Sequence, residues 1–463
     1  MTDLTTGPVG GHLRRQAAAF SLGLVAIFSF EAVDLYFISR LGDAPLAAVA
    51  FTFPVIWLVY GIGIGFEAGT ASVVSRAIGR KDGGRARRLT TDSTVLATAV
   101  LGIIGLVGLG TIDPVFRLLG ATDDLMLIIR DYMGVWYWLA PMDACLWTCL
   151  ASLRARGRAD VEARIITTTA ILNLILDPIF IFGLFGFPQL EVMGAALATL
   201  VSTATMLGVS MWILAARMQV FANPFVPLAQ MIESWRHMLT IGLPAVLTNT
   251  IIPFSSAIVV SMIAAYGVDA VAGFGVAARI EPFALLVFYS LSAVASPFFG
   301  QNFSADQHGR LFEARRLITG FCLGYGLLLA IVMALLARPI TGLFSDSETI
   351  RQVAVHYIWL VAWGYGAHGL VMSVNAAFNG TGRPLPGVVI SVSRVIVLFL
   401  PLAFLGRWLI GLEGIFAATT ICNVLLAVLG WHWLGRHIAS HAHYPQAEAT
   451  ASPPAGGDRQ APP

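Results

Sequence analysis

The chain contains two similar halves, and an offset of 225 residues brings one onto the other. Segment 42–49 follows a long apolar stretch, and segment 267–274, which resembles it, follows another. The same offset carries Gly157 onto Gly382 and Asp143 onto His368. Two copies of one membrane unit, running in the same direction, are typical of a transporter whose halves enclose a cavity.

Composition identifies the solvent of the chain as a lipid bilayer. The sequence is 57% hydrophobic and only 12% charged, whereas a soluble domain has roughly 25% charged residues. Apolar runs of about 20 residues are long enough to cross the hydrocarbon core. We predict an all-α integral membrane protein with twelve transmembrane helices in two six-helix lobes. The predicted spans are 15–39, 45–75, 90–110, 132–153, 162–184, 193–216, 238–264, 270–299, 316–337, 352–377, 386–405 and 413–435.

Basic residues predict the orientation of these spans. One side carries Arg14, Arg15, Arg76, Arg80, Lys81, Arg85, Arg87, Arg88, Arg154, Arg156, Arg158, Arg164, Arg217, Arg236, Arg310, Arg315, Arg316, Arg383, Arg436 and Arg459, and the other Arg40, Arg117, Arg130, Arg338, Arg351 and Arg407. The crowded side is predicted to be cytoplasmic, with both termini on it. We expect a multi-pass protein of a bacterial-type plasma (inner) membrane. The net charge of +2 gives no indication of nucleic-acid binding.

The predicted organisation follows from these spans. Residues 1–14 form a cytoplasmic N-terminus, 15–216 the N-lobe, 217–237 a cytoplasmic linker, 238–436 the C-lobe and 437–463 a disordered tail rich in Pro, Ala and Gly.

Cys145 and Cys149 are four residues apart, which is compatible with a metal pair. Without a second cysteine pair or clustered histidines, small apolar core residues are the preferred interpretation.

Ionisable residues inside the spans are candidates for function, because each costs several kcal/mol in hydrocarbon unless it faces a cavity or a partner. They are Glu31, Asp34, Glu67, Asp143, Asp177, Arg279, Glu281 and Arg394. Most of the acids lie in the first half, whereas the second half has Val259 opposite Asp34 and His368 opposite Asp143. This asymmetry predicts that the first lobe handles the ion.

Asp177 has the strongest local signal. Asn173 lies one helical turn before it on the same face. Pro178 has no N–H and leaves the carbonyl of Leu174 without its helical partner. Three oxygens at one place suit a small hard cation or a shared proton. The alternative is a proline kink with a satisfied Asn–Asp hydrogen bond.

Asp34 is the second anchor of the predicted site. Glu31 lies three residues before it, so both acids occupy roughly one helix face, and in a low-dielectric site one of them is expected to hold a proton. A neutral, hydrogen-bonded Glu31 with no role in transport is the alternative. Glu67 lies among Gly61, Gly63, Gly65 and Gly69, where close helix packing explains it at least as well as transport.

The second half offers fewer candidates. Arg279 and Glu281 are two residues apart and cannot face each other on a straight helix, although Pro282 can bend it. We favour a structural ion pair with other spans. Glu31, Asp143, Glu281 and His368 are therefore candidates for lining the cavity or relaying protons.

Several runs together give the chain a resemblance to the multidrug and toxic compound extrusion (MATE) family. They are Val33-Asp34-Leu35-Tyr36-Phe37-Ile38-Ser39-Arg40-Leu41-Gly42, Ser75-Arg76-Ala77-Ile78-Gly79-Arg80, Leu172-Asn173-Leu174-Ile175-Leu176-Asp177-Pro178-Ile179-Phe180, Arg279-Ile280-Glu281-Pro282-Phe283 and Gly300-Gln301-Asn302. Each run is weak evidence, but their order and spacing are specific and cover nearly the whole chain.

The resemblance implies a V-shaped antiporter that exports cationic or amphipathic organic compounds against inward Na⁺ or H⁺. It looks most similar to the DinF-like branch, whose first-lobe cation site maps onto Asp34, Asn173, Asp177 and Thr199, the implied Na⁺ ligands. The NorM-like branch uses a seventh-span Glu and a tenth-span Asp, and this chain has no acid at either place, with His368 at the second. The first span lacks the proline often found in the family, which argues against proline-dependent bending of that helix.

Two other functions fit parts of the sequence. A lipid-linked oligosaccharide flippase of the same superfamily would share the repeat, but its cavity needs several cations for a pyrophosphate, and only Arg279 and Arg394 lie within spans. An intramembrane aspartyl protease would need an Asp dyad in a Gly-x-Gly-Asp motif, which is absent. We therefore expect a transporter and not an enzyme, with no cofactor, small organic partners in a lipid bilayer and a monomeric state.

Overall fold

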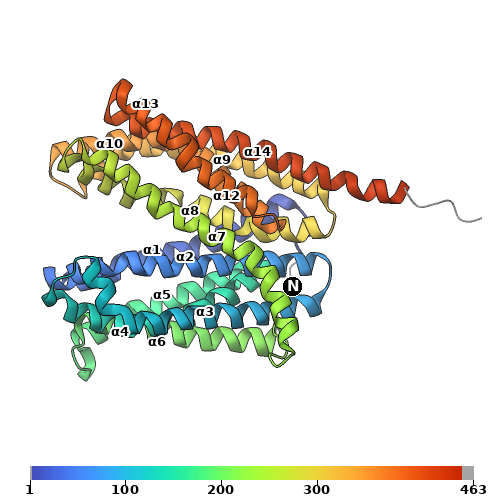
Figure 1. The fold of residues 1–463 in the computed structure, drawn as a ribbon, viewed down its shortest axis with the longest axis horizontal. Coiled ribbons are helices and arrows are strands. Elements are labelled where there is room, and N and C mark those ends of the chain that lie inside the picture. The colour runs from blue at the N-terminus through green and yellow to red at the C-terminus, as the bar shows by residue number, and fades with distance from the viewer. Residues whose placement is uncertain (1–2, 451–463) are drawn as a thin grey trace, which may run out of the picture.

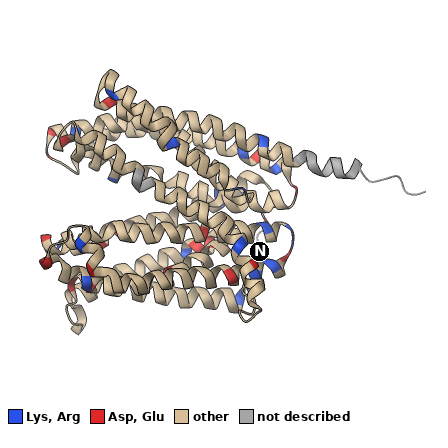
Figure 2. Ribbon diagram, viewed as in Figure 1, with Lys and Arg blue, Asp and Glu red and all other residues tan. Residues whose placement is uncertain are grey.

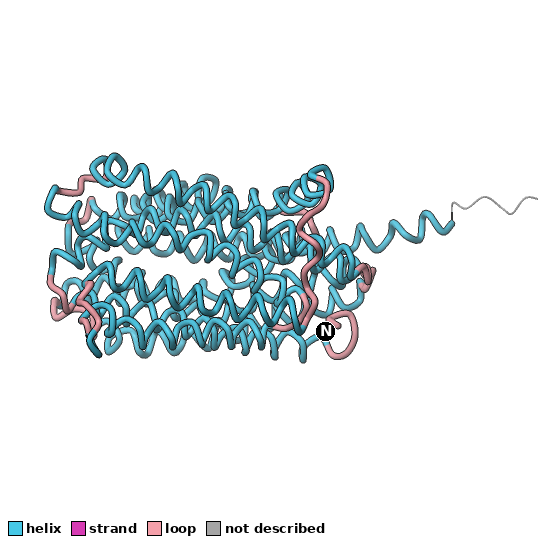
Figure 3. The backbone as a smooth tube through the Cα atoms, turned by 90° about the horizontal axis from the view of Figure 1, so that it is seen from below, coloured by secondary structure: helices cyan, strands magenta, loops and turns pink. Residues whose placement is uncertain are grey.

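The computed structural model describes residues 3–450, without the side chains of residues 252–254 and 442–450. Every secondary-structure element in this part of the chain is helical, and the loops lie mainly at the two ends of the molecule (Figure 3). The elements are α1 (Val9–Ser39), α2 (Asp43–Gly79), α3 (Gly83–Leu118), α4 (Asp123–Ala155), α5 (Ala159–Phe182), η1 (Leu184–Gly186), α6 (Glu191–Trp212), η2 (Ile213–Arg217), α7 (Leu228–Ala264), α8 (Val268–Ser304), α9 (His308–Gly342), α10 (Glu348–Val361), η3 (Ala362–Gly364), α11 (Tyr365–Gly380), α12 (Leu385–Val392), η4 (Ser393–Phe399), α13 (Leu400–Ile410) and α14 (Leu412–Thr450).

The helices confirm the repeat. α2 and α8 begin at residues 43 and 268 and end at residues 79 and 304, so both ends differ by 225. The backbone turns repeat as well, because Gly42 and Gly267 have φ of 119° and 101°, and Gly157 and Gly382 have φ of 70° and 82°. Glycine adopts such positive φ values without a Cβ clash. The sequence match therefore reflects two copies of one structural unit.

All twelve predicted spans are present, and most of their helices are longer than the roughly 20 residues that cross a hydrocarbon core. Ten of the described helices are long and apolar enough to cross a membrane by length and composition alone. The other two spans are α4, which contains charged residues such as Asp131 and Asp143, and the tenth, which η3 divides into α10 and α11. Charged residues gather near the helix ends and are sparse along their middles (Figure 2).

Three helices extend beyond their predicted spans. α1 begins at Val9, inside the predicted N-terminus, and α7 begins at Leu228, so the second part of the predicted linker is helical. α14 continues to Thr450 and overturns the disordered tail for residues 437–450. His437 stacks on Phe303 with ring centroids 5.3 Å apart, and this contact holds α14 against the C-lobe beyond its apolar run. Residues 451–463 lie outside the described part of the chain.

The two lobes exchange the first parts of α1 and α7. Leu13 and Phe20 of α1 are buried in the core of the C-lobe. Met238 and Ile241 of α7 are buried in the core of the N-lobe. Because α1 and α7 are repeat mates, the exchange is reciprocal, and Figure 1 shows the helix groups close together near the N-terminus and diverging toward the other end.

Hydrogen bonds between the lobes, within residues 3–450, lie at the end that carries both termini, which we call the terminal end. The hydroxyl of Ser72 donates to the carbonyl of Asn379. The amide of Gln301 donates to the carbonyl of Ala155 at 2.6 Å. The backbones approach closely here, since a Cβ on Gly79 would overlap the backbone of Gln301. The lobes are therefore joined at the terminal end.

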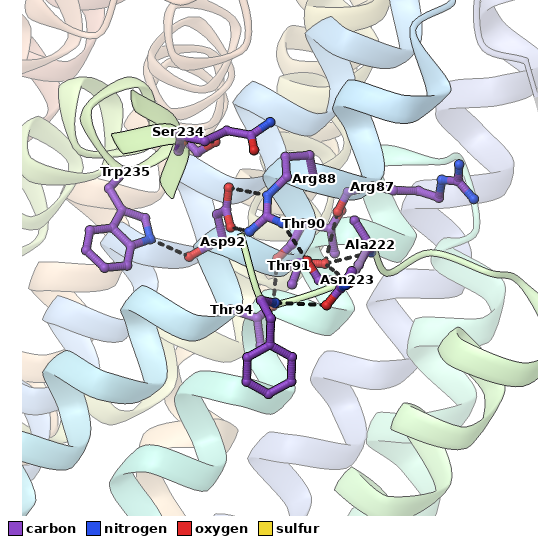
Figure 4. A network of polar contacts seen from close by, with 12 residues as sticks. Arg87, Arg88, Thr90, Thr91, Asp92, Thr94, Ala222, Asn223, Ser234 and Trp235 are labelled. Atoms are coloured by element: carbon purple, nitrogen blue, oxygen red, sulfur yellow. Dashed lines mark hydrogen bonds and ion pairs between the residues drawn. The ribbon is translucent and has the colours of Figure 1, made fainter. Parts of the chain in front are cut away.

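The linker between the lobes docks on α3 (Figure 4). Arg88 pairs with Asp92 and donates to the carbonyl of Asn223 at 2.6 Å. The Thr91 hydroxyl accepts from the N–H of Ala222 at 2.9 Å, and the Trp235 indole donates to the carbonyl of Asp92 at 2.9 Å. Arg88, counted among the cytoplasmic loop cations, is thus a buried residue that fixes the linker to the N-lobe.

Candidate functional site

The predicted site residues of α5 and α6 lie together inside the N-lobe. Asn173 and Asp177 are both buried, one turn apart on α5, and Thr199 faces them from α6. With its amide oriented to satisfy both neighbours, Asn173 donates to Oδ2 of Asp177 at 2.9 Å and accepts from the N–H and hydroxyl of Thr199 at 3.1 Å each. α5 continues through Pro178 without interruption. The Asn–Asp hydrogen bond of the alternative interpretation is thus possible, but it satisfies only one carboxylate oxygen.

Asp34 of α1 joins this group. Asp34 is half-buried, and it lies close enough to Asp177 and to Glu31 for their charges to repel. Within the described residues, Oδ1 of Asp34 and Oδ1 of Asp177 are buried and have no hydrogen-bond partner. A buried carboxylate oxygen without a donor is costly. Both oxygens are therefore available to a cation or a proton.

Two tyrosines that the sequence interpretation missed extend the acidic group across the N-lobe. Tyr132 of α4 is buried and interacts electrostatically with Asp34 and Asp177. Tyr60 of α2 lies near Asp143, Tyr132 and Glu31. The two tyrosines thus lie among four of the first-lobe acids, Glu31, Asp34, Asp143 and Asp177. No sequence signal distinguishes these tyrosines from lipid-facing ones.

An aromatic cluster surrounds Tyr60. Its ring centroid lies 5.1 Å from that of Trp147, 5.8 Å from Trp136 and 6.2 Å from Trp57. The Trp57 side chain is exposed and Trp136 is buried. Edge-on and tilted aromatic rings of this kind can contact planar organic molecules and cations.

The C-lobe has its own polar group, formed around Glu281 of α8. The Tyr357 hydroxyl donates to Oε2 of Glu281 at 3.0 Å, and the charge of Arg394 on η4 also acts on Glu281. Arg394 acts on half-buried His368 of α11 as well. The predicted candidates Glu281 and His368 therefore lie in one neighbourhood, and Arg394 of another span lies near both. Arg279 is exposed and is not the partner of Glu281.

A third buried group lies in the N-lobe toward the terminal end, and sequence reasoning placed its cation in a cytoplasmic loop. Arg154 is buried and forms a bidentate pair with Glu162, with N···O distances of 3.0 and 2.7 Å. It also pairs with Glu67 and lies 4.7 Å from the ring centroid of Phe20. Glu67 thus acts in helix packing, as the packing interpretation expected.

Comparisons with known proteins agree with this architecture. A family model described as MatE matches residues 19–179 and again residues 244–405, so its two matches begin 225 residues apart. The crystal structure of the Vibrio cholerae MATE transporter VcmN in the bent form superposes with a TM-score of 0.89 at 28% identity, covering 94% of this chain and 98% of that one.

Two curated relatives indicate the range of activities among similar chains. A protein of Shewanella oneidensis described as an FAD transporter is 35% identical and covers 92% of this chain and 94% of its own length. A Staphylococcus aureus protein described as the multidrug export protein MepA is 25% identical and covers 91% of this chain and 92% of its own.

Proposed function

Because the chain belongs to the MATE family of multi-pass membrane transporters, we propose that it exports amphipathic organic compounds in exchange for Na⁺ or H⁺. The single observation that supports coupling is the group Asp34, Asn173, Asp177 and Thr199. It brings two carboxylates, an amide and a hydroxyl together in the N-lobe. Hard oxygen ligands suit a small hard cation such as Na⁺, and two close carboxylates also suit a shared proton. This arrangement fits the DinF-like branch.

Charge neutralisation couples the ion to the conformation. With both acids ionised, Asp34 on α1 and Asp177 on α5 repel each other. A cation or proton between them removes the repulsion and lets α1 pack more closely against α5 and α6. An ion that favours one helix arrangement by its binding energy shifts the equilibrium toward that arrangement. Because α1 also completes the C-lobe core, a movement of α1 changes the packing of both lobes.

The arrangement of the lobes supports alternating access. The lobes are hydrogen-bonded at the terminal end and diverge at the other (Figure 1). Since the terminal end carries most of the basic residues outside the spans, we assign it to the cytoplasm of a bacterial-type inner membrane. The structure then corresponds to a state that is closed toward the cytoplasm. Export requires the opposite state to form when the lobes separate at Ser72 and Gln301.

A second candidate substrate is FAD. The relative that is 35% identical is described as an FAD transporter. The aromatic cluster at Tyr60 also offers rings that can stack on flavin or adenine. The flippase alternative shares the pyrophosphate but lacks support from the relatives described above.

The test uses the purified full chain in proteoliposomes with imposed Na⁺ and pH gradients, each applied separately. Two substrates are compared, a fluorescent cationic dye and FAD. Movement of either substrate that follows one gradient supports the proposal and identifies the coupling ion. Movement of FAD but not of the dye narrows the substrate class to flavin nucleotides. Failure of both substrates under both gradients, with correctly inserted protein, contradicts the proposal and favours the flippase.

A further inference from the structure

The terminal end of the C-lobe holds a group of metal-ligating side chains that has no part in the proposed transport. Asp306 lies in the turn between α8 and α9, His308 is the first residue of α9, and His441 lies near the end of α14. One ligand atom from each residue lies within 4.8 Å of the other two. Two segments that are far apart in sequence, the α8–α9 turn with the first residue of α9 and the later part of α14, thus bring two imidazoles and one carboxylate close together.

The histidines of this group have unused nitrogens. Within the described residues, both ring nitrogens of His308 and Nδ1 of His441 are buried without a hydrogen-bond partner. Oδ1 of Asp306 lies 3.9 Å from Nε2 of His308 and 3.8 Å from Nδ1 of His441. These distances are too long for hydrogen bonds. Ligand atoms around a tetrahedral Zn²⁺ are about 3.3 Å apart, which small side-chain rotations would reach from here.

The surroundings hold the group in place. The Phe303 ring lies 4.2 Å from the ring of His441 and stacks on His437, one helical turn earlier. The turn that carries Asp306 is also fixed, because Asp306 has φ of 56°, and its repeat mate Lys81 has φ of 61°. The backbone of the turn is thus common to both lobes, whereas the ligands are not. Lys81 and Gly83 occupy the equivalent places in the N-lobe.

From this arrangement we propose that Asp306, His308 and His441 form a binding site for a divalent transition metal ion such as Zn²⁺. Two neutral imidazoles and a carboxylate are a donor set that suits Zn²⁺ and neighbouring metals, and a water molecule completes four-coordination. The bound ion ties the end of α14 to the α8–α9 turn. Binding of the ion requires no rearrangement of the helices, because the ligand atoms already lie close together.

The site has a structural consequence at the terminal end. Two residues after His308, Arg310 donates to the carbonyls of Leu4 at 2.8 Å and Gly7 at 2.6 Å. Leu4 in turn donates to the side chain of Gln301, which bonds to Ala155 of the N-lobe. A metal ion that stiffens the α8–α9 turn therefore supports the contacts that join the lobes. We expect Zn²⁺ to stabilise the state that is closed at this end.

The test is Zn²⁺ binding by the purified full chain after removal of any affinity tag and treatment with a chelator. Titration against a fluorescent Zn²⁺ indicator should give one tight site per chain. Asp306→Asn and His441→Ala should each weaken it by more than about tenfold, the loss that removal of even an outer-shell partner causes. His432→Ala is the matched control, because His432 is an exposed histidine on the same helix, and it should bind as the unaltered protein does.

A second measurement distinguishes loss of the Zn²⁺ site from misfolding of a variant. Zn²⁺ should raise the apparent melting temperature of the unaltered protein and of His432→Ala, but not that of His441→Ala, whose melting temperature without metal should be unchanged. Unchanged Zn²⁺ affinity in both Asp306→Asn and His441→Ala would place the ion elsewhere and overturn the proposal. An equal loss of Zn²⁺ affinity in the His432→Ala control would also overturn the proposal, because it would indicate unspecific binding to surface histidines.

Discussion

The two lobes place a tyrosine at the same point of the repeat but surround it with opposite charge balance. Tyr132 and Tyr357 are 225 residues apart and both buried. Tyr132 lies beside Asp34 and Asp177, to which the N-lobe offers no neighbouring cation among the described contacts. Tyr357 bonds to Glu281, and the positive charge of Arg394 also acts on that acid. The acids Asp34 and Asp177 of the N-lobe thus have no cation near them among the described contacts, whereas Glu281 of the C-lobe has Arg394 nearby.

This difference in charge explains why similar lobes can have different functions. A buried carboxylate must be neutralised by a proton, a metal ion or a cationic side chain. In the C-lobe the cationic side chain of Arg394 already acts on Glu281, so we expect Glu281 to depend less on an ion from solution. In the N-lobe the missing cation has to come from outside, which links its arrival to the state of the protein. The following experiments examine this asymmetry.

The largest effect is expected from Asp177→Asn and from Asp34→Asn. Each change keeps the shape of the side chain but removes an acid from the N-lobe group, so gradient-driven export should be abolished while the protein stays folded in the membrane. Efflux from proteoliposomes and gel filtration in detergent measure both properties. Asp131→Asn, at an exposed acid of α4, should transport normally. Transport by Asp177→Asn at the unaltered rate would show that this acid is not needed for coupling.

Asn173→Ala should separate the two possible ions. Na⁺ needs several oxygens at once, whereas a proton needs only one carboxylate, so the loss of the amide should reduce Na⁺-driven export more than H⁺-driven export. A shared site also requires Na⁺ binding to release a proton, so acidification should weaken Na⁺ binding. Calorimetry at pH 6 and pH 8 tests this linkage. Equal Na⁺ affinity at the two pH values would mean that the acids serve as a proton relay only.

A smaller effect is expected from His368→Ala in the C-lobe. His368 lies near Arg394, and a neutral imidazole there can contact substrate without titrating against the gradient. The change should alter substrate preference or affinity while leaving the ion dependence of transport intact. Concentration series for several substrates under each gradient provide the measurement. Loss of Na⁺ or pH dependence with Asp34 and Asp177 in place would show that coupling extends into the C-lobe.

The smallest effect should come from Tyr357→Phe. This change removes one hydrogen bond to Glu281 and should lower the free energy of unfolding by about 1 kcal/mol, as loss of a single hydrogen bond typically does. The apparent melting temperature should fall slightly, and gradient-driven export should continue. Uncoupled or abolished transport in a stable Tyr357→Phe protein would mean that the two tyrosines have equivalent roles.

The sequence predicted much of this arrangement for physical reasons that particular residues illustrate. Apolar runs determine spans, and the offset that placed Gly157 on Gly382 also located the backbone turns. Asn173 and Asp177 were predicted to share a face because four residues form one helical turn. The meeting of both with Thr199 follows from the resemblance, and the geometry agrees. All of these inferences rest on local spacing or on the repeat.

Contacts between distant spans were not predictable in the same way. Arg154 looks like a loop cation until Glu67 and Glu162 are seen beside it. Nothing in the order of residues brings His308 to His441, so the histidines did not form a recognisable cluster. The exchange of α1 and α7 was also missed, because an apolar run shows that a helix lies in the membrane but not which lobe it packs in.

That exchange affects how the protein can be made. A ribosome completes α1 early, but the core into which Leu13 and Phe20 fit is supplied by helices synthesised much later. Neither lobe can therefore finish folding while the other is missing, and the membrane must hold a partly assembled N-lobe during synthesis of the C-lobe. The same dependence means that two separate chains, divided in the linker at residues 218–227, can become stable only by assembling with each other.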